Sequence, residues 1–129
     1  MSPGERLPRQ RRLLAIDTFG AVLTAAITLG LLASGVVASG VPSVVWWALG
    51  SLAVGMGLQG LVALWRSWPP ASELRRLAVA NSAYALGALT AIGVFRDTVT
   101  TVVAAYVIVE ALILMVLAAI EWQAARVEP

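Results

Sequence analysis

The sequence contains no cysteine, no histidine and no lysine among its 129 residues. Without cysteine, the chain cannot form a disulfide framework, a cysteine zinc site or a thiol redox pair. Without histidine, it lacks the commonest haem and zinc ligand and the usual proton shuttle. No nucleophile–histidine pair, phosphate-binding loop or metal cage is present. We therefore expect neither an enzyme nor a bound metal or cofactor.

Charge is also scarce. Only 12% of the residues are charged, 60% are apolar, and the mean hydropathy is +0.87. A soluble domain carries about 25% charged residues, so half that share is hard to reconcile with a surface facing water. The net charge of +2 is spread over several loops. Because phosphate binding needs clustered positive charge, we expect no nucleic acid partner.

What remains is dominated by four apolar stretches, each at least the ~20 residues that a membrane-spanning helix needs. The first is too long for the 7–15-residue apolar core typical of a signal peptide. Short polar or proline-containing breaks separate the stretches, which favours neighbouring helices that run in opposite directions. The sequence thus predicts an all-α polytopic membrane protein, an antiparallel bundle of four transmembrane helices over residues 13–122. The expected helices are about 13–38, 44–65, 74–95 and 98–122, with a basic segment at 1–12 and a tail at 123–129.

All nine positive charges are arginines, and their distribution predicts the orientation. Eight lie in the N-terminal segment, the central loop or the C-terminal tail, whereas only Arg96 lies on the other side. Positive loops stay in the cytoplasm, so both termini are expected there. Trp46 and Trp47 would then lie at the outer interface, with Trp65, Trp68 and Trp122 at the inner one. Because arginine without lysine is typical of GC-rich bacterial genomes, we expect the bacterial cytoplasmic (inner, plasma) membrane.

The segment from Gly55 to Gly60 matches the GxGxxG pattern of dinucleotide-binding loops. That pattern carries its meaning only between a strand and a helix, whereas here it lies inside a predicted span. Small residues instead allow helices to approach closely in lipid. We expect this packing role for Gly50, Gly57, Gly60, Gly30 and Gly87.

Four polar side chains, one from each helix, lie at a similar distance from the inner arginines. Counting ~1.5 Å per residue places them about 7–11 Å inward. They are Asp17, Gln59, Asn81 and Glu121, with Tyr84 one turn deeper than Asn81. This layer could bind a ligand or ion. Alternatively, the amides join helices by hydrogen bonds and the acids reach headgroup water.

Glu110 lies at the centre of the fourth span, where a charge costs at least ~2.5–3.5 kcal/mol. We expect this carboxyl to be protonated and to hydrogen bond to Thr28 or Thr90, with Tyr106 one turn away. It could be a proton-coupled or ligand-binding group, or a neutral acid that joins helices or specifies an oligomer.

Several short motifs resemble a group of small bacterial four-helix membrane proteins. They are Asn81-x-x-Tyr84, Val109-Glu110-Ala111-Leu112 and Leu117-Ala118-Ala119-x-Glu121, together with Asp17 early in the first helix. The resemblance covers nearly the whole chain but implies no activity, because the group has none established. Members often have an amide where Glu110 stands. Small multidrug-resistance transporters are similar in size only, since their membrane carboxylate lies in the first helix.

These observations leave three functional hypotheses. The first is a non-enzymatic accessory, interaction or structural component of the membrane, whose partners are the bilayer and a second copy or another membrane protein. The second is a proton-coupled transporter of small molecules that works as an oligomer through Glu110. The third is a lipid- or hydrophobic-ligand-binding protein that uses the polar layer.

Overall fold

The computed structural model describes residues 3–66 and 70–126, and all regular secondary structure in these ranges is helical. It comprises α1 (Pro3–Ile27), a short π-helical continuation η1 (Thr28–Ala33), α2 (Ser43–Trp65), α3 (Pro70–Val94) and α4 (Thr101–Ala125). Four helical stretches are long and apolar enough to cross a bilayer, with mean hydropathies from 1.5 to 2.7. The prediction of an all-α chain with four helices of membrane-spanning length is confirmed.

Large apolar side chains cover the outside of the bundle. Phe19 is 71% exposed, Val102 77% and Leu112 61%. A helix that is apolar on all sides needs apolar surroundings, and the hydrocarbon core of a bilayer provides them. This surface therefore suggests a multi-pass membrane protein.

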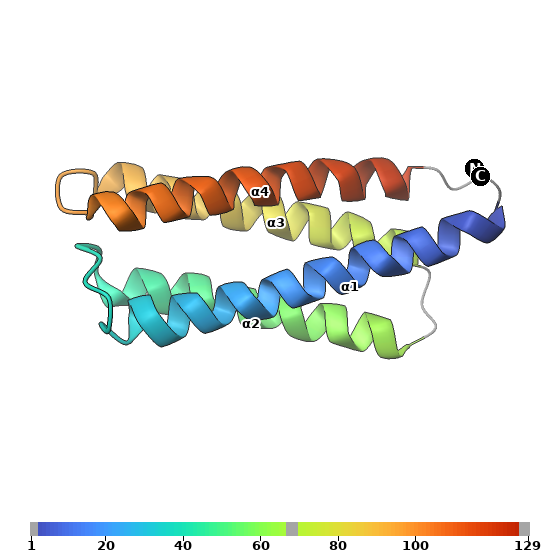
Figure 1. Cartoon of the computed structure of the whole chain (residues 1–129), viewed down its shortest axis with the longest axis horizontal. Coiled ribbons are helices and arrows are strands. Elements are labelled where there is room, and N and C mark those ends of the chain that lie inside the picture. Colours follow the sequence, from blue (N-terminus) through green and yellow to red (C-terminus); the bar gives the residue numbers. More distant parts are fainter. Residues whose placement is uncertain (1–2, 67–69, 127–129) are drawn as a thin grey trace.

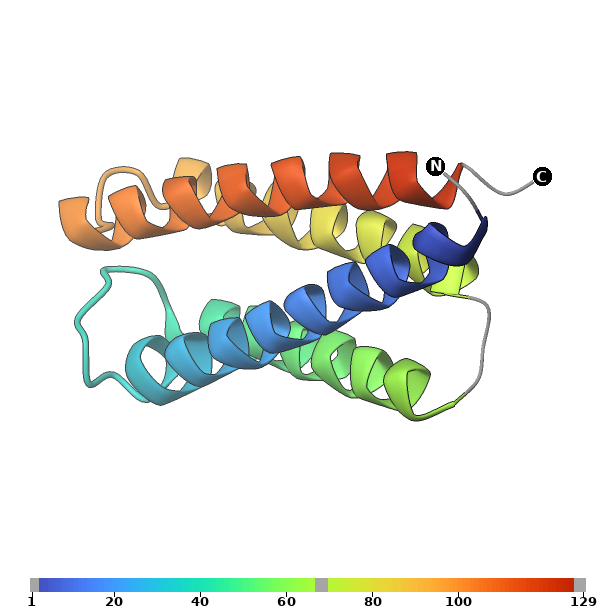
Figure 2. The same cartoon turned by 45° about the vertical axis from the view of Figure 1, so that its right-hand side comes forward.

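The helices form two pairs, in which α1 packs mainly against α2 and α3 mainly against α4. In both views α1 crosses the bundle obliquely, lying beside α2 at its η1 end and approaching α3 and α4 toward its start (Figures 1 and 2). The first turn of α1 and the last turn of α4 lie at the same end (Figure 1). This crossing brings polar residues of α1 to α3 and α4 in the half of the bundle where α4 ends.

The first helix differs from its predicted range of 13–38. It begins at Pro3 and its helical continuation ends at Ala33. Gly35 then adopts a φ of +78°, and the amide of Val37 donates to the carbonyl of Leu31 at 2.9 Å. A glycine in this left-handed conformation is a common way to end a helix. Hydropathy did not reveal this end, because the loop that follows is also apolar.

The other helix starts also differ from expectation. The third helix, α3, begins at Pro70, four residues before the expected start at residue 74. Proline is favoured at that position, since its missing N–H would have no helical partner there. The fourth helix, α4, begins at Thr101 and not at residue 98, and it is capped by Thr100, whose hydroxyl accepts from the Val103 amide at 3.4 Å.

Small residues let the paired helices approach closely. A Cβ built on Gly60 would overlap the hydroxyl of Thr18, and one on Gly50 would overlap the side chain of Leu29. At Gly57 it would come within 3.3 Å of Val22 Cγ2, and at Gly87 within 3.6 Å of Leu49 Cδ2. These four glycines therefore lie at helix contacts, three of them between α1–η1 and α2.

The packing role expected for Gly30 is not seen. A Cβ at this position would meet nothing within 4 Å among the described residues. Gly30 lies on the outer side of η1, because the face of η1 that packs inward carries Thr28, Leu32 and Ala33.

Two loops meet at the end of the bundle opposite the last turn of α4. Ser39 accepts a hydrogen bond from the Thr100 amide through its carbonyl (2.9 Å) and another from the Trp46 indole through its hydroxyl (2.8 Å). Trp46 is buried, whereas Trp47 is exposed. Trp46 lies in the first turn of α2, at this end of the bundle, and its ring packs in the core while its N–H holds the loop.

Candidate functional site

Three polar side chains from three helices meet inside the bundle. The Asn81 amide on α3 donates through Nδ2 to Asp17 Oδ1 on α1 at 2.7 Å, and to Glu121 Oε2 on α4 at 3.2 Å. All three residues are buried, with exposures of 2% or less. We call these three residues the acid–amide cluster. It links α1 to the α3–α4 pair through side chains that are far apart in the sequence.

The hydrogen bonds of the cluster leave one oxygen of each carboxyl without a donor. Asp17 Oδ2 and Glu121 Oε1 are buried and accept no hydrogen bond from the described residues. The two carboxyls accept from the same Asn81 nitrogen and so lie close together, but two ionised carboxylates have no hydrogen to share. Like charges in contact also repel strongly in a buried site. A single proton shared between the two acids would supply the missing donor and remove the repulsion.

Glu110 lies on the same side of the bundle, nearer its middle. Its Oε1 accepts a hydrogen bond from the Thr24 hydroxyl on α1 at 2.9 Å, and Tyr106 hydrogen bonds to it from one turn earlier on α4. The expected partners were Thr28 and Thr90. Thr28 pairs instead with the Tyr84 hydroxyl at 3.4 Å, and Thr90 donates to a carbonyl of its own helix.

A groove of about 300 Å³ runs between α1 and α4. The polar residues among its lining are Asp17, Thr24, Tyr106 and Glu110. Its walls are otherwise apolar and include Ile16, Leu23 and Ile27 from α1 with Val109, Ile113 and Leu117 from α4. The structure thus places two of the predicted site residues, Asp17 and Glu110, along one apolar groove. We call it the α1–α4 groove.

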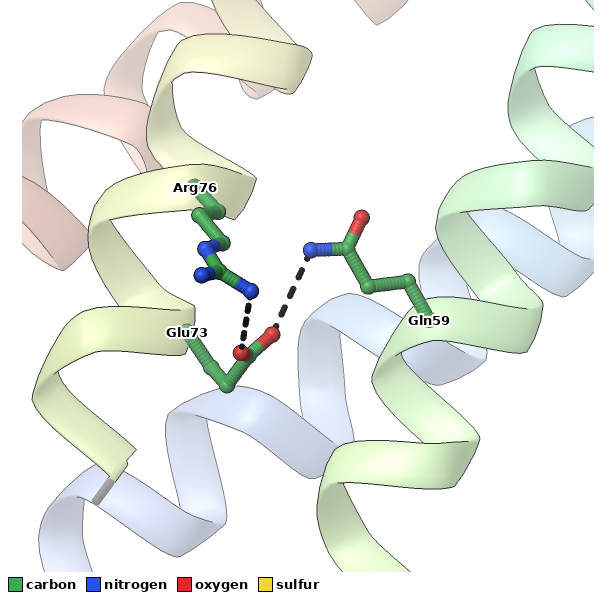
Figure 3. A network of polar contacts seen from close by, with 3 residues as sticks. All are labelled: Gln59, Glu73 and Arg76. Atoms are coloured by element: carbon green, nitrogen blue, oxygen red, sulfur yellow. Dashed lines mark hydrogen bonds and ion pairs between the residues drawn. The ribbon is translucent and has the colours of Figure 1, made fainter. Parts of the chain in front are cut away.

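Gln59 was predicted to share a layer with Asp17, Asn81 and Glu121, but it does not join the acid–amide cluster. Its Nε2 donates to Glu73 Oε2 at 3.3 Å, and Arg76 Nη1 donates to the other oxygen of Glu73 at 3.1 Å (Figure 3). The face of α2 that carries Gln59 points to the start of α3.

Glu73 is a buried site residue that the sequence reasoning missed. Glu73 was not among the predicted site residues, yet its side chain is only 2% exposed and it forms the ion pair with Arg76. The spacing of Glu73 and Arg76, three residues apart on one helix, was the available signal, because such residues are neighbours on a helix surface. This spacing did not show that Gln59 would cover the Glu73 carboxyl.

The chemistry that these residues allow is binding and proton exchange. No group of three or more potential metal ligands was found among residues 3–66 and 70–126. Comparisons with protein family models, with curated proteins and with solved structures found no match. The function must therefore be argued from the geometry of this chain.

Proposed function

We propose that this chain is a multi-pass protein of the bacterial cytoplasmic membrane that binds an apolar, membrane-dissolved molecule in the α1–α4 groove and catalyses no reaction. Its four helices are proposed to cross the bilayer in alternating directions, with both termini in the cytoplasm. Eight of the nine arginines support this orientation, because positive loops are retained on that side. The common end shared by the first turn of α1 and the last turn of α4 is consistent with it (Figure 1).

The observation that carries the binding proposal is a carboxyl group inside an apolar groove. Glu110 is placed there by Thr24 and Tyr106, and the surrounding walls are apolar. Ligand pockets combine such walls with a few placed polar groups and have volumes of about 300–1,000 Å³. The groove lies at the lower end of this range. Its chemistry suits a single apolar chain that carries a hydroxyl or amine as its hydrogen-bonding group.

Filling the groove tests this proposal. Gly20 lines it, and a Cβ at Gly20 would meet nothing within 4 Å. Gly20→Leu is therefore expected to occupy the groove without displacing neighbours. We expect a photoactivatable long-chain alcohol to label residues 16–27 and 106–117 of the purified protein. Labelling should fall about tenfold in Gly20→Leu, which corresponds to about 1.4 kcal/mol of lost affinity. Mass spectrometry of the labelled peptides measures both the position and the extent of labelling.

Gly55→Leu is the matched control, since Gly55 also has open space around it and lies outside the α1–α4 groove. It should leave labelling unchanged. Glu110→Gln retains a hydrogen-bonding group and should retain labelling, whereas Glu110→Leu should lose it. Labelling spread evenly over the lipid-facing surface, or equal in Gly20→Leu and the unmodified chain, would overturn the proposed function.

A further inference from the structure

A second depression lies on another side of the bundle, where α2, α3 and α4 meet. It has a volume of about 540 Å³ and is lined by Gln59, Arg75, Arg76, Val79 and Trp122. None of these residues contributes to the α1–α4 groove. We call it the arginine cleft.

Guanidinium groups gather around the cleft. Arg75 Nη2 donates to the Ala125 carbonyl at 3.1 Å, which holds this side chain against the end of α4. The Arg76 side chain is 65% exposed and is anchored by Glu73 beneath it (Figure 3). Arg126 does not line the cleft itself, but its Cζ lies 5.8 Å from the centre of the ring of Trp122, which does. Each guanidinium carries five N–H donors, and the hydrogen bonds described for Arg75 and Arg76 use one on each.

An apolar groove continues from the cleft along the outside of α3 and α4. Val79 and Trp122 line both depressions, and the groove adds residues such as Ala83, Leu86 and Met115, with a volume of about 580 Å³. On α3 it extends from Ala78 to Leu86, which is about 12 Å at ~1.5 Å per residue. One leaflet of the hydrocarbon core is about 15 Å deep, half of ~30 Å. The groove therefore has the length of an acyl chain segment within one leaflet.

We propose that the arginine cleft and the groove below it bind one anionic phospholipid. The phosphate lies between Arg75, Arg76 and Arg126, and one acyl chain follows the groove past Val79 toward Leu86. Charge complementarity selects this occupant, because guanidinium groups match the geometry of phosphate oxygens. Trp122 lies where the headgroup and the chain meet, which is the depth that tryptophan favours in membranes. Basic pockets between helices at a membrane surface bind anionic headgroups by the same physics.

The test compares lipids that differ only in headgroup charge. The full chain is purified in a neutral detergent and mixed with phosphatidylglycerol, with phosphatidylcholine of the same acyl chains, or with inorganic phosphate. Retained lipid is counted by native mass spectrometry, and the thermal unfolding midpoint is measured in parallel. We expect about tenfold higher retention of phosphatidylglycerol than of phosphatidylcholine. Inorganic phosphate alone should not raise the unfolding midpoint.

Two variants locate the site, and both spare the Arg76–Glu73 pair. Arg75→Gln/Arg126→Gln should lower phosphatidylglycerol retention to the phosphatidylcholine level. Ala83→Leu fills the apolar groove and should lower it without changing any charge. Matched controls are Arg96→Gln, which removes an exposed arginine at the other end, and Gly93→Leu, which adds the same side chain in open space on α3. Both should retain lipid normally.

Equal retention of the two lipids by the unmodified chain would overturn the proposal, and this measurement needs no variant to fold. Unchanged retention in both site variants would overturn it as well. Stabilisation by inorganic phosphate to the same extent as by phosphatidylglycerol would show a free-anion site and not a lipid site.

Discussion

Replacing Asn81 by aspartate is expected to lower the free energy of unfolding by about 3 kcal/mol or more, although the two side chains have nearly the same shape. Asn81 provides the N–H donor for both Asp17 and Glu121. The substitution places a third acid beside these two and removes that donor. Leaving a buried polar group unsatisfied costs about 1–3 kcal/mol, and breaking the pairing of a buried charge costs about 3–5 kcal/mol.

Asp17→Asn is the matched control, because it makes the opposite isosteric change within the same cluster. The new amide can still accept from Asn81 and adds a donor that can reach Glu121. We expect its stability to lie within about 1 kcal/mol of the unmodified chain, the typical net worth of a hydrogen bond. Equilibrium unfolding in mixed detergent micelles, followed by tryptophan fluorescence, measures both variants. A loss in Asp17→Asn as large as that in Asn81→Asp would contradict a shared proton, because it would show that the negative charge itself is required.

The cluster also shows how far residue spacing can predict a site in a membrane bundle. Counting residues from the flanking arginines placed Asp17, Asn81 and Glu121 at one depth, and the structure brings them into contact. The same count included Gln59, which instead covers Glu73. Depth follows from the rise per residue alone. The direction in which a side chain points depends on how each helix is rotated, and tertiary packing decides that.

The spacing of apolar residues along the sequence did not predict how each helix of this chain is rotated about its own axis. Large apolar residues occur on the outer surfaces of all four helices, as Phe19, Leu58, Leu86 and Leu112 show. In lipid, the inner face is distinguished by small and polar residues and not by apolar ones. The glycines at helix contacts were predictable for that reason, whereas Gly30 shows that a small residue alone does not identify an inner face.

Glu110 was identified correctly as an acid near the middle of the fourth helix, with Tyr106 one turn away, but its threonine partner was not predicted. Thr24 and Tyr106 hydrogen bond to it, where Thr28 and Thr90 were expected. The difference arises because α1 crosses the bundle obliquely (Figure 1). Residues on α1 and α4 that have the same residue count from the flanking arginines are therefore not opposite one another. The angles between helix axes are set by side-chain packing. Counting residues from the flanking arginines assumes that these angles are zero.

Gly40→Ala is expected to lower the free energy of unfolding by about 2–5 kcal/mol, the second large effect. Gly40 has a φ of +73°, which costs a residue with a Cβ about 1–2 kcal/mol. In addition, a Cβ on Gly40 would overlap the backbone carbonyl of Thr98. Backbone cannot move aside like a flexible side chain, and overpacking of this kind typically costs about 1–3 kcal/mol. The substitution should therefore separate the loop after η1 from the loop before α4.

Gly35→Ala separates the two contributions. Gly35 has a similar φ of +78°, but a Cβ there would meet nothing within 4 Å, so we expect only the conformational cost of about 1–2 kcal/mol. The hydrogen bond from the Thr100 amide to the Ser39 carbonyl, 2.9 Å long, reports the contact directly. Hydrogen exchange of the Thr100 amide should accelerate in Gly40→Ala and not in Gly35→Ala. Equal losses of stability and equal exchange in the two variants would mean that this loop contact does not hold the α1–α2 pair to the α3–α4 pair.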